Sequence, residues 1–78
     1  MANTNILIPG NGRLITVTIT GTETTITLGG DARVFTQFNA GSETVSNADG
    51  ESVALERTEA QALFDKMKIY APDAITLA

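Results

Sequence analysis

The side chains in this sequence that could do acid–base or metal chemistry are carboxylates, because the chain contains no histidine and no cysteine. Asp31 follows a double glycine, and Asp49 and Glu51 lie on either side of Gly50. A hard cation such as calcium needs about six to eight ordered oxygen ligands, and these acids are not spaced to supply them. Aspartate is also common in turns because it tolerates the turn backbone. We therefore expect no catalytic residue, no metal site, no cofactor and no enzyme activity.

The segment Gly10-Asn11-Gly12 resembles a phosphate-binding loop only in its glycine content. Phosphate loops are followed by a lysine and connect a strand to a helix, and neither feature occurs here. The segment instead predicts a tight turn after Pro9, and no small-molecule substrate is expected.

Threonine recurs at every second position in two neighbouring segments, at Thr16, Thr18 and Thr20 and at Thr25 and Thr27. If the two segments pair in register, their hydroxyl and methyl groups form rows like the threonine ranks of ice-binding proteins. Those proteins use long, repeated ranks, whereas these two rows are short and lie on a sheet that should twist. Threonine also favours the wet face of a strand for its own conformational reasons. The rows therefore predict strands rather than an ice-binding surface.

Alternating apolar and polar residues predict several short strands in the first two thirds of the chain. The expected strands cover residues 5–8, 13–20, 24–28, 33–38, 44–46 and 52–55. The last two flank Asp49-Gly50, a dipeptide typical of a type I′ hairpin turn. This spacing indicates an antiparallel meander with one wet face.

A helix is predicted to begin at Thr58, whose hydroxyl can cap the first turn together with Gln61, while Glu59 suits the helix dipole. Pro72 ends it near Ile69 or Tyr70, and residues 73–78 resemble a last short strand. An apolar stripe follows helical spacing through Ala60, Leu63, Phe64 and Met67. If the helix reaches Ile69, the Ile69 side chain is exposed opposite this stripe. If the helix ends earlier, the Ile69 side chain folds inward.

The chain of 78 residues predicts one domain, residues 1–78, with 42% hydrophobic and 18% charged residues. The expected fold class is α+β, mainly β: a small antiparallel barrel or sandwich of five to six short strands with one helix at about 58–69.

The formal charge is −4 and the five basic residues are scattered, which disfavours nucleic acid as a partner. A small barrel that binds single-stranded nucleic acid remains an alternative. Such a barrel needs an aromatic side chain beside a basic one, and only Arg33-Val34-Phe35 offers this combination. No signal peptide or membrane-spanning segment is expected, so no membrane partner is expected.

Two features point to a protein partner. Residues 1–9 are a candidate extended N-terminal arm, in which Ile6, Leu7 and Ile8 are apolar on both faces, as in a strand that joins another sheet. The alternative is an ordinary strand in a hairpin with residues 14–17, which the Asn11-Gly12 turn favours. Alternation also places Phe35 opposite Val34 and Phe38, where an interface could cover it. The predicted partner-binding residues are therefore Ile6, Leu7, Ile8 and Phe35.

In its apolar arm (residues 3–9), its threonine-rich β body up to Leu28 and its compact C-terminal half, the chain resembles capsid decoration (cement) proteins of tailed bacteriophages. The resemblance is one of composition and layout. It implies a protein on the outside of a capsid, commonly a dimer or trimer, that joins shell subunits through an extended arm. It implies no active site.

The expected function is therefore structural: a phage capsid decoration or other minor virion protein that stabilises the shell. Its expected partners are the major capsid protein or another virion subunit, together with further copies of itself. Its expected location is the virion after synthesis in the host cytoplasm, or otherwise the cytoplasm. The alternative is a small adaptor or inhibitor that binds one protein in a one-to-one complex.

Overall fold

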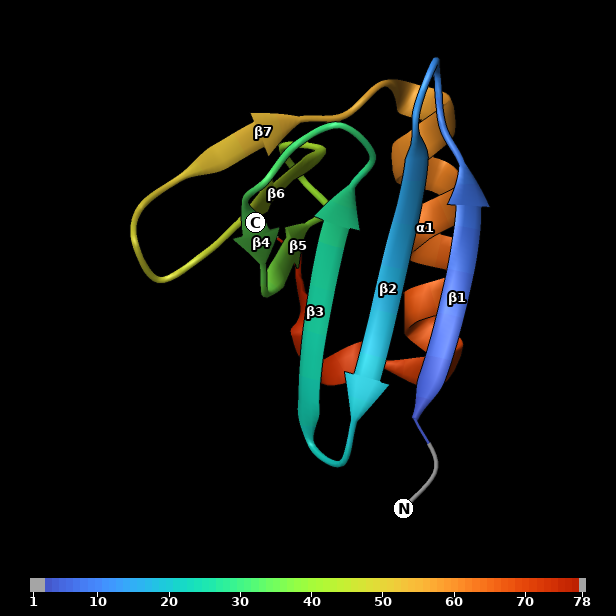
Figure 1. The fold of residues 1–78 in the computed structure, drawn as a ribbon, viewed down its shortest axis with the longest axis vertical. Helices are drawn as coiled ribbons and strands as arrows, with labels where there is room; N and C mark the ends of the chain where they lie inside the picture. The colour runs from blue at the N-terminus through green and yellow to red at the C-terminus, as the bar shows by residue number, and fades with distance from the viewer. Residues whose placement is uncertain (1–2, 78) are drawn as a thin grey trace.

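A computed structural model describes residues 3–77, which form two four-stranded sheets and one α-helix (Figure 1). The predicted fold class, α+β and mainly β, is confirmed. The structure has eight strands where five to six were expected, and two of them are only two residues long. Neither sheet closes on itself, and the predicted barrel or sandwich is not confirmed.

The first sheet, sheet A, is an antiparallel meander in which every strand pairs with the next one along the chain. The alternation of its residues sends one set of side chains to the core and the other to the opposite face, as the sequence predicts. Its strands are β1 (Thr4–Pro9), β2 (Leu14–Thr20), β3 (Glu23–Leu28) and β4 (Val34–Phe35).

The second sheet, sheet B, has the order β7-β6-β5-β8. Its strands are β5 (Gln37–Asn39), β6 (Thr44–Ser46), β7 (Ser52–Ala54) and β8 (Ile75–Thr76). The predicted last strand is present as β8, but it lies parallel to β5, so the structure is not wholly antiparallel. Thr36 separates β4 from β5, and the chain changes sheets at this residue.

The turn between β6 and β7 differs from the predicted type I′ turn, which needs positive φ at two successive residues. Only Gly50 has a positive φ here, at 83°, and Asp49 does not. The Asn47 side-chain oxygen accepts the backbone N–H groups of Asp49 and Glu51, each at 3.1 Å. This local hydrogen bonding selects a longer loop with a single left-handed glycine.

Helix α1 (Arg57–Tyr70) begins one residue earlier than expected and is capped by different residues. Its N-cap is Glu56, whose backbone N–H donates to the Glu59 carboxylate at 2.9 Å, so the prediction of a Thr58 cap is wrong. The helix reaches Tyr70, as Pro72 predicted, and Ile69 is 66% exposed. A 3-10 turn, η1 (Pro72–Ala74), then leads into β8.

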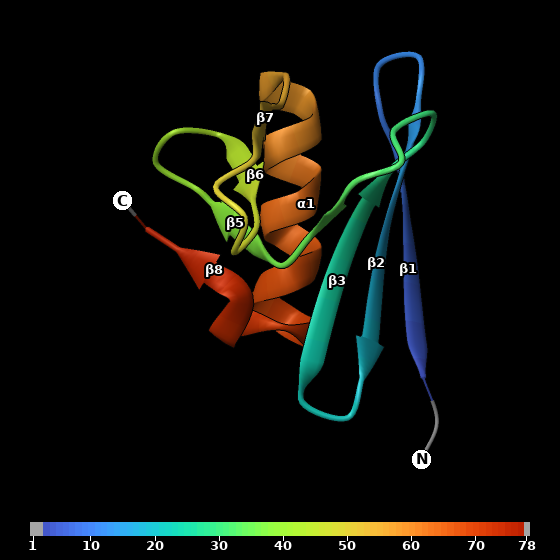
Figure 2. The ribbon, with the colours of Figure 1, turned by 60° about the vertical axis from the view of Figure 1, so that its left-hand side comes forward.

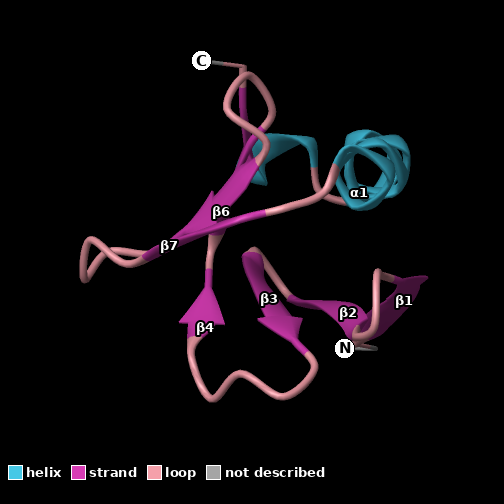
Figure 3. Ribbon diagram, turned by 90° about the horizontal axis from the view of Figure 1, so that it is seen from above, coloured by secondary structure: helices cyan, strands magenta, loops and turns pink. Residues whose placement is uncertain are grey.

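The hydrophobic core lies between the inner face of sheet A, the helix and sheet B. Seen from above, α1 and sheet B lie on the same side of sheet A, and no helix or strand of residues 3–77 covers its other face (Figure 3). Figure 2 shows α1 running beside sheet A, with the strands of sheet B on its far side. The largest fully buried hydrophobic side chains are Phe35, Phe38, Ile8, Ile15, Ile26, Leu28, Leu63 and Met67. Among the described residues, no helix has the length and apolar character required to cross a bilayer.

Candidate functional site

Three of the four predicted partner-binding residues lie in β1, which is an edge strand of sheet A. Ile6 and Ile8 face inward and are buried, at 8% and 1% exposure. Leu7 faces the opposite way and is 62% exposed. Residues 4–9 therefore form the hairpin strand that was the alternative to a free arm, and of these three residues only Leu7 exposes its side chain to solvent.

The outer edge of β1 offers backbone hydrogen bonds that no other strand of residues 3–77 takes up. The Gly10 N–H donates to the Arg13 carbonyl at 2.7 Å, and hydrogen-bonded pairs alternate along an antiparallel ladder. Asn5 and Leu7 therefore direct their N–H and C=O groups outward, while Pro9 has only a carbonyl to offer. The strand carries no charge from Thr4 to Pro9.

Side chains on the outer face of sheet A form two rows without charged residues, in which the threonines are half-buried. The first row runs across all four strands from Leu7 through Thr16 and Thr27 to Val34, which is 47% exposed. The second contains Asn5, Thr18 and Thr25. The predicted pairing of the threonine segments is thus confirmed for these four threonines, although Thr20 pairs with Glu23.

The fourth predicted partner-binding residue, Phe35, is fully buried, so the expectation that it is exposed is wrong. The error comes from treating residues 33–38 as one strand. Because the chain changes sheets at Thr36, alternation does not continue through that residue, and both Phe35 and Phe38 face the core. The Arg33 guanidinium lies 5.4 Å from the Phe35 ring centroid. A ring with 0% exposure cannot stack on a base, which removes the reason for the single-strand-binding alternative.

Two of the three turn carboxylates, Asp31 and Glu51, have local side-chain partners, and Asp49 is exposed at the β6–β7 turn. Asp31 forms two hydrogen bonds with the Arg33 guanidinium, at 3.0 and 2.7 Å, and these lower the pKa of Asp31 to about 2. Glu51 accepts the Asn47 side-chain amide at 3.0 Å. No group of three potential metal ligands occurs in the part of the chain that the structure describes.

Glu59 is the centre of a buried polar cluster. From the sequence it was expected only to interact favourably with the helix dipole. Glu59 is 1% exposed, and its two oxygens accept the Arg13 Nη2 at 2.9 Å and the Arg13 Nε at 3.0 Å. The backbone N–H groups of Asn11 and Glu56 donate to it as well, each at 2.9 Å. The Arg13 hydrogen bonds are the largest cause that lowers the pKa of Glu59 to about 2. All these bonds are internal, so the cluster links the β1–β2 turn to the start of α1.

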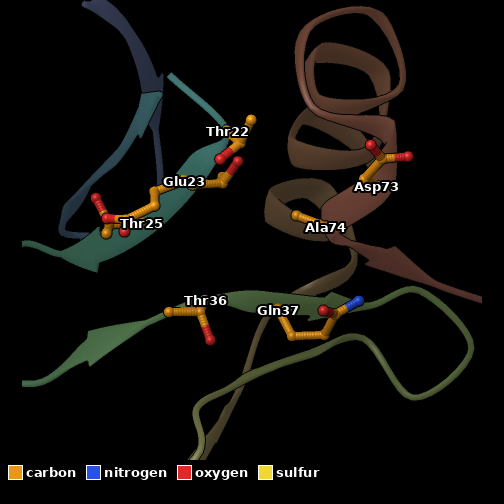
Figure 4. A pocket seen from close by; sticks show the side chains of 8 residues that line it. Thr22, Glu23, Thr25, Thr36, Gln37, Asp73 and Ala74 are labelled. Atoms are coloured by element: carbon orange, nitrogen blue, oxygen red, sulfur yellow. The ribbon is translucent and has the colours of Figure 1, made fainter. Parts of the chain in front are cut away.

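A surface pocket of about 290 Å³ lies where the start of β3 approaches Thr36, Gln37 and η1 (Figure 4). Glu23 and Asp73 reach it from opposite walls, and threonine side chains lie beside Glu23. Two separated carboxylates and neutral hydroxyls do not form a nucleophile–base pair. The pocket therefore carries no assigned chemistry.

The edge of β1 and the outer face of sheet A are thus the candidate functional site, because within residues 3–77 they combine unpaired backbone groups with side chains that carry no charge. No protein-family model, curated protein or solved structure matches the chain, so this assignment comes from the geometry of the site alone.

Proposed function

We propose that this protein is a non-enzymatic structural protein of a tailed-phage virion, of the capsid decoration (cement) type or another minor component. In this role it binds the major capsid protein or another virion subunit and stabilises the shell. The observation that supports the proposal best is the uncharged outer edge of β1, with Leu7 exposed beside it. Sheet edges in proteins are usually protected by charge, bulges or a covering segment, and an edge without charge favours pairing with another strand.

An extended segment of the partner would pair with Asn5 and Leu7 and continue sheet A by one strand. Its side chains on the outer face would lie next to Leu7, at the end of the row that runs to Val34. The outer-face rows carry no charge, so a flat apolar surface can approach them without desolvating ions. Repetition of one such contact over a symmetric shell would add binding strength through avidity.

The test is cosedimentation of the purified chain with mature heads of a tailed phage whose genome carries this sequence. We expect a fixed ratio of chain to shell subunit, and we expect Leu7→Lys to abolish pelleting. Ile69→Lys is the matched control, because it adds the same charge to an apolar side chain of similar exposure on α1, which lies on the opposite side of sheet A. Equal loss in both variants, or no binding by the wild type, would contradict the assignment. Replacing Ile6 or Ile8 is unsuitable, because both are core residues.

Stoichiometry separates this role from that of a one-to-one adaptor or inhibitor, for which the same edge would serve. Light scattering coupled to size exclusion over a range of concentrations gives the oligomeric state. A dimer or trimer that persists on dilution supports the shell-binding role. A monomer that forms an equimolar complex with one soluble protein supports the adaptor.

A further inference from the structure

A second pocket, about 220 Å³ in volume, lies between α1 and sheet B. Its apolar walls include the rings of Phe38 and Phe64, whose centroids are 6.5 Å apart and whose planes are tilted by 57°. Phe38 is buried, but Phe64 is only half-buried and leaves ring surface open to the pocket. The volume falls below the roughly 300–1,000 Å³ of small-molecule sites and suits a single long side chain. We call it the Phe64 pocket; its lining is completed by Ala40, Glu43, Ala60 and Gln61.

Glu43 is held at the edge of this pocket in an unusual backbone conformation. It is the one non-glycine residue of the described chain with a positive φ, at 56°. Its carbonyl accepts the Leu55 N–H at 2.8 Å, which fixes the peptide in place. Non-glycine residues in this region are strained, and they persist where the surroundings require a particular side chain or direction. A glycine would relieve the strain but would remove the carboxylate from the pocket.

Two cationic groups of the chain itself already lie around the Phe64 pocket. The Arg57 Nη2 is 3.9 Å from the Glu43 Oε1, and the Arg57 side chain is 86% exposed. The Lys68 Nζ is 5.8 Å from the Phe64 ring centroid. Exposed ion pairs contribute little to stability, so an incoming cation could replace Arg57 at small cost. An incoming cation with an apolar stem would therefore have to take the place of Arg57 at the Glu43 carboxylate and of Lys68 at the Phe64 ring.

We propose that the Phe64 pocket binds an arginine side chain of a partner protein. The stem and the guanidinium plane lie against the Phe64 ring, and the guanidinium pairs with the Glu43 carboxylate, from which it displaces Arg57. Arginine fits better than lysine, because its planar group stacks on aromatic rings and pairs with a carboxylate through two hydrogen bonds. The pocket is lined by residues of α1, β5 and the β5–β6 turn, so it is separate from the β1 edge and does not depend on its role.

The experiment is an NMR titration of the full ¹⁵N-labelled chain with Nα-acetyl-arginine methylamide. The citrulline analogue is the control ligand, because it has nearly the same shape and no charge. We expect saturable shifts centred on Glu43, Gln61 and Phe64 with the arginine compound and none with the citrulline compound. Equal binding of both compounds, shifts spread over the whole surface, or no saturable shifts would overturn the proposal.

Variants of one ion pair should change the affinity in opposite directions. Glu43→Gln should weaken arginine binding about tenfold, since it removes a charge-assisted pair, and Arg57→Gln should strengthen it by removing the competitor. Asp49→Asn is the matched control for Glu43→Gln, because it removes the same charge at the exposed β6–β7 turn and should change nothing.

Glu43→Gly separates binding from folding. This variant should melt no lower than the wild type, because it relieves the positive φ, and yet lose arginine binding. A decrease in affinity for Arg57→Gln, or retained binding in Glu43→Gly, would refute the site.

Discussion

Arg13 and Glu59, which are 46 positions apart in the chain, form a two-point ion pair in which Nη2 lies 2.9 Å from Oε1 and Nε lies 3.0 Å from Oε2. The pair joins the turn between β1 and β2 to the first turn of α1. Both segments lie at the same end of the molecule (Figure 1). Because Glu59 is almost fully buried, its charge is stabilised by these bonds and not by water. The pair therefore adds a polar link at the start of the helix to the apolar packing of Ala60, Leu63 and Met67 against the core.

Glu59→Gln is expected to destabilise the protein by about 2–4 kcal/mol, since it leaves the Arg13 cation without its buried counter-charge. Urea unfolding followed by circular dichroism would measure the change. Asp31→Asn is the control, because it removes a carboxylate from an exposed arginine pair and should have little effect. A similar loss in both variants would show that burial of the Glu59 pair is not what matters.

The same carboxylate predicts how stability depends on pH. The pKa of Glu59 is lowered from 4.5 to about 2 in the folded protein, so its contribution is complete above pH 4.5 and is lost as the pH falls towards 2. Thermal melts of the wild type should therefore decline through this window. The Glu59→Gln variant should decline less, and the two curves should converge near pH 2. Parallel curves across the window would contradict the assignment.

Gly10 provides space for the ion pair. A Cβ at this position would overlap the Glu59 Oε2 and would lie 2.9 Å from the Arg13 carbonyl oxygen. Gly10→Ala should therefore cost about 2–3 kcal/mol through overpacking. Gly12→Ala is a useful comparison, because Gly12 has open space and a φ of 77°, so only backbone strain of about 1 kcal/mol applies. Chemical denaturation should rank Gly10→Ala as the more damaging change.

Substitution of Phe35 and of Leu7 should separate a core residue from a surface residue. Phe35→Ala should cost about 3–5 kcal/mol, because it leaves a cavity in the core. Leu7→Ala should change stability by less than about 0.5 kcal/mol, since its side chain is largely exposed. Equilibrium unfolding of the two variants gives both values. A large loss for Leu7→Ala would mean that the outer face of sheet A is covered in solution.

The sequence allowed β2, β3 and the helix to be predicted because their apolar residues follow simple periodicities. The register of Thr16 with Thr27 and of Thr18 with Thr25 followed from a tight turn between two alternating segments. Ile6 and Ile8 were not recognised as core residues, because a run of three apolar residues does not show which ones face inward. The hairpin register shows which residues face inward, since Ile6 and Ile8 pair with residues of β2 that face the core.

The remaining features depend on tertiary contacts that the local sequence does not reveal. Alternation could not show that the chain changes sheets at Thr36, so the side on which Phe35 lies was predicted wrongly. Glu59 was recognised for its place in the first helical turn, but its partner Arg13 lies 46 residues away. The strain at Glu43 has no local signal, because glutamate is ordinary in a turn of this kind until its φ is known.

The order of events during folding follows from the same connectivity. β1, β2 and β3 pair in sequence across short turns, so this meander can form while the rest of the chain is still unfolded. Docking of α1 must instead close a loop of 46 residues to bring Glu59 to Arg13. Arrival of the helix, rather than pairing of the strands, is therefore the step expected to set the folding rate. Substitutions in the Arg13–Glu59 pair should slow folding if the pair has formed at the transition state, and should speed unfolding if it forms afterwards.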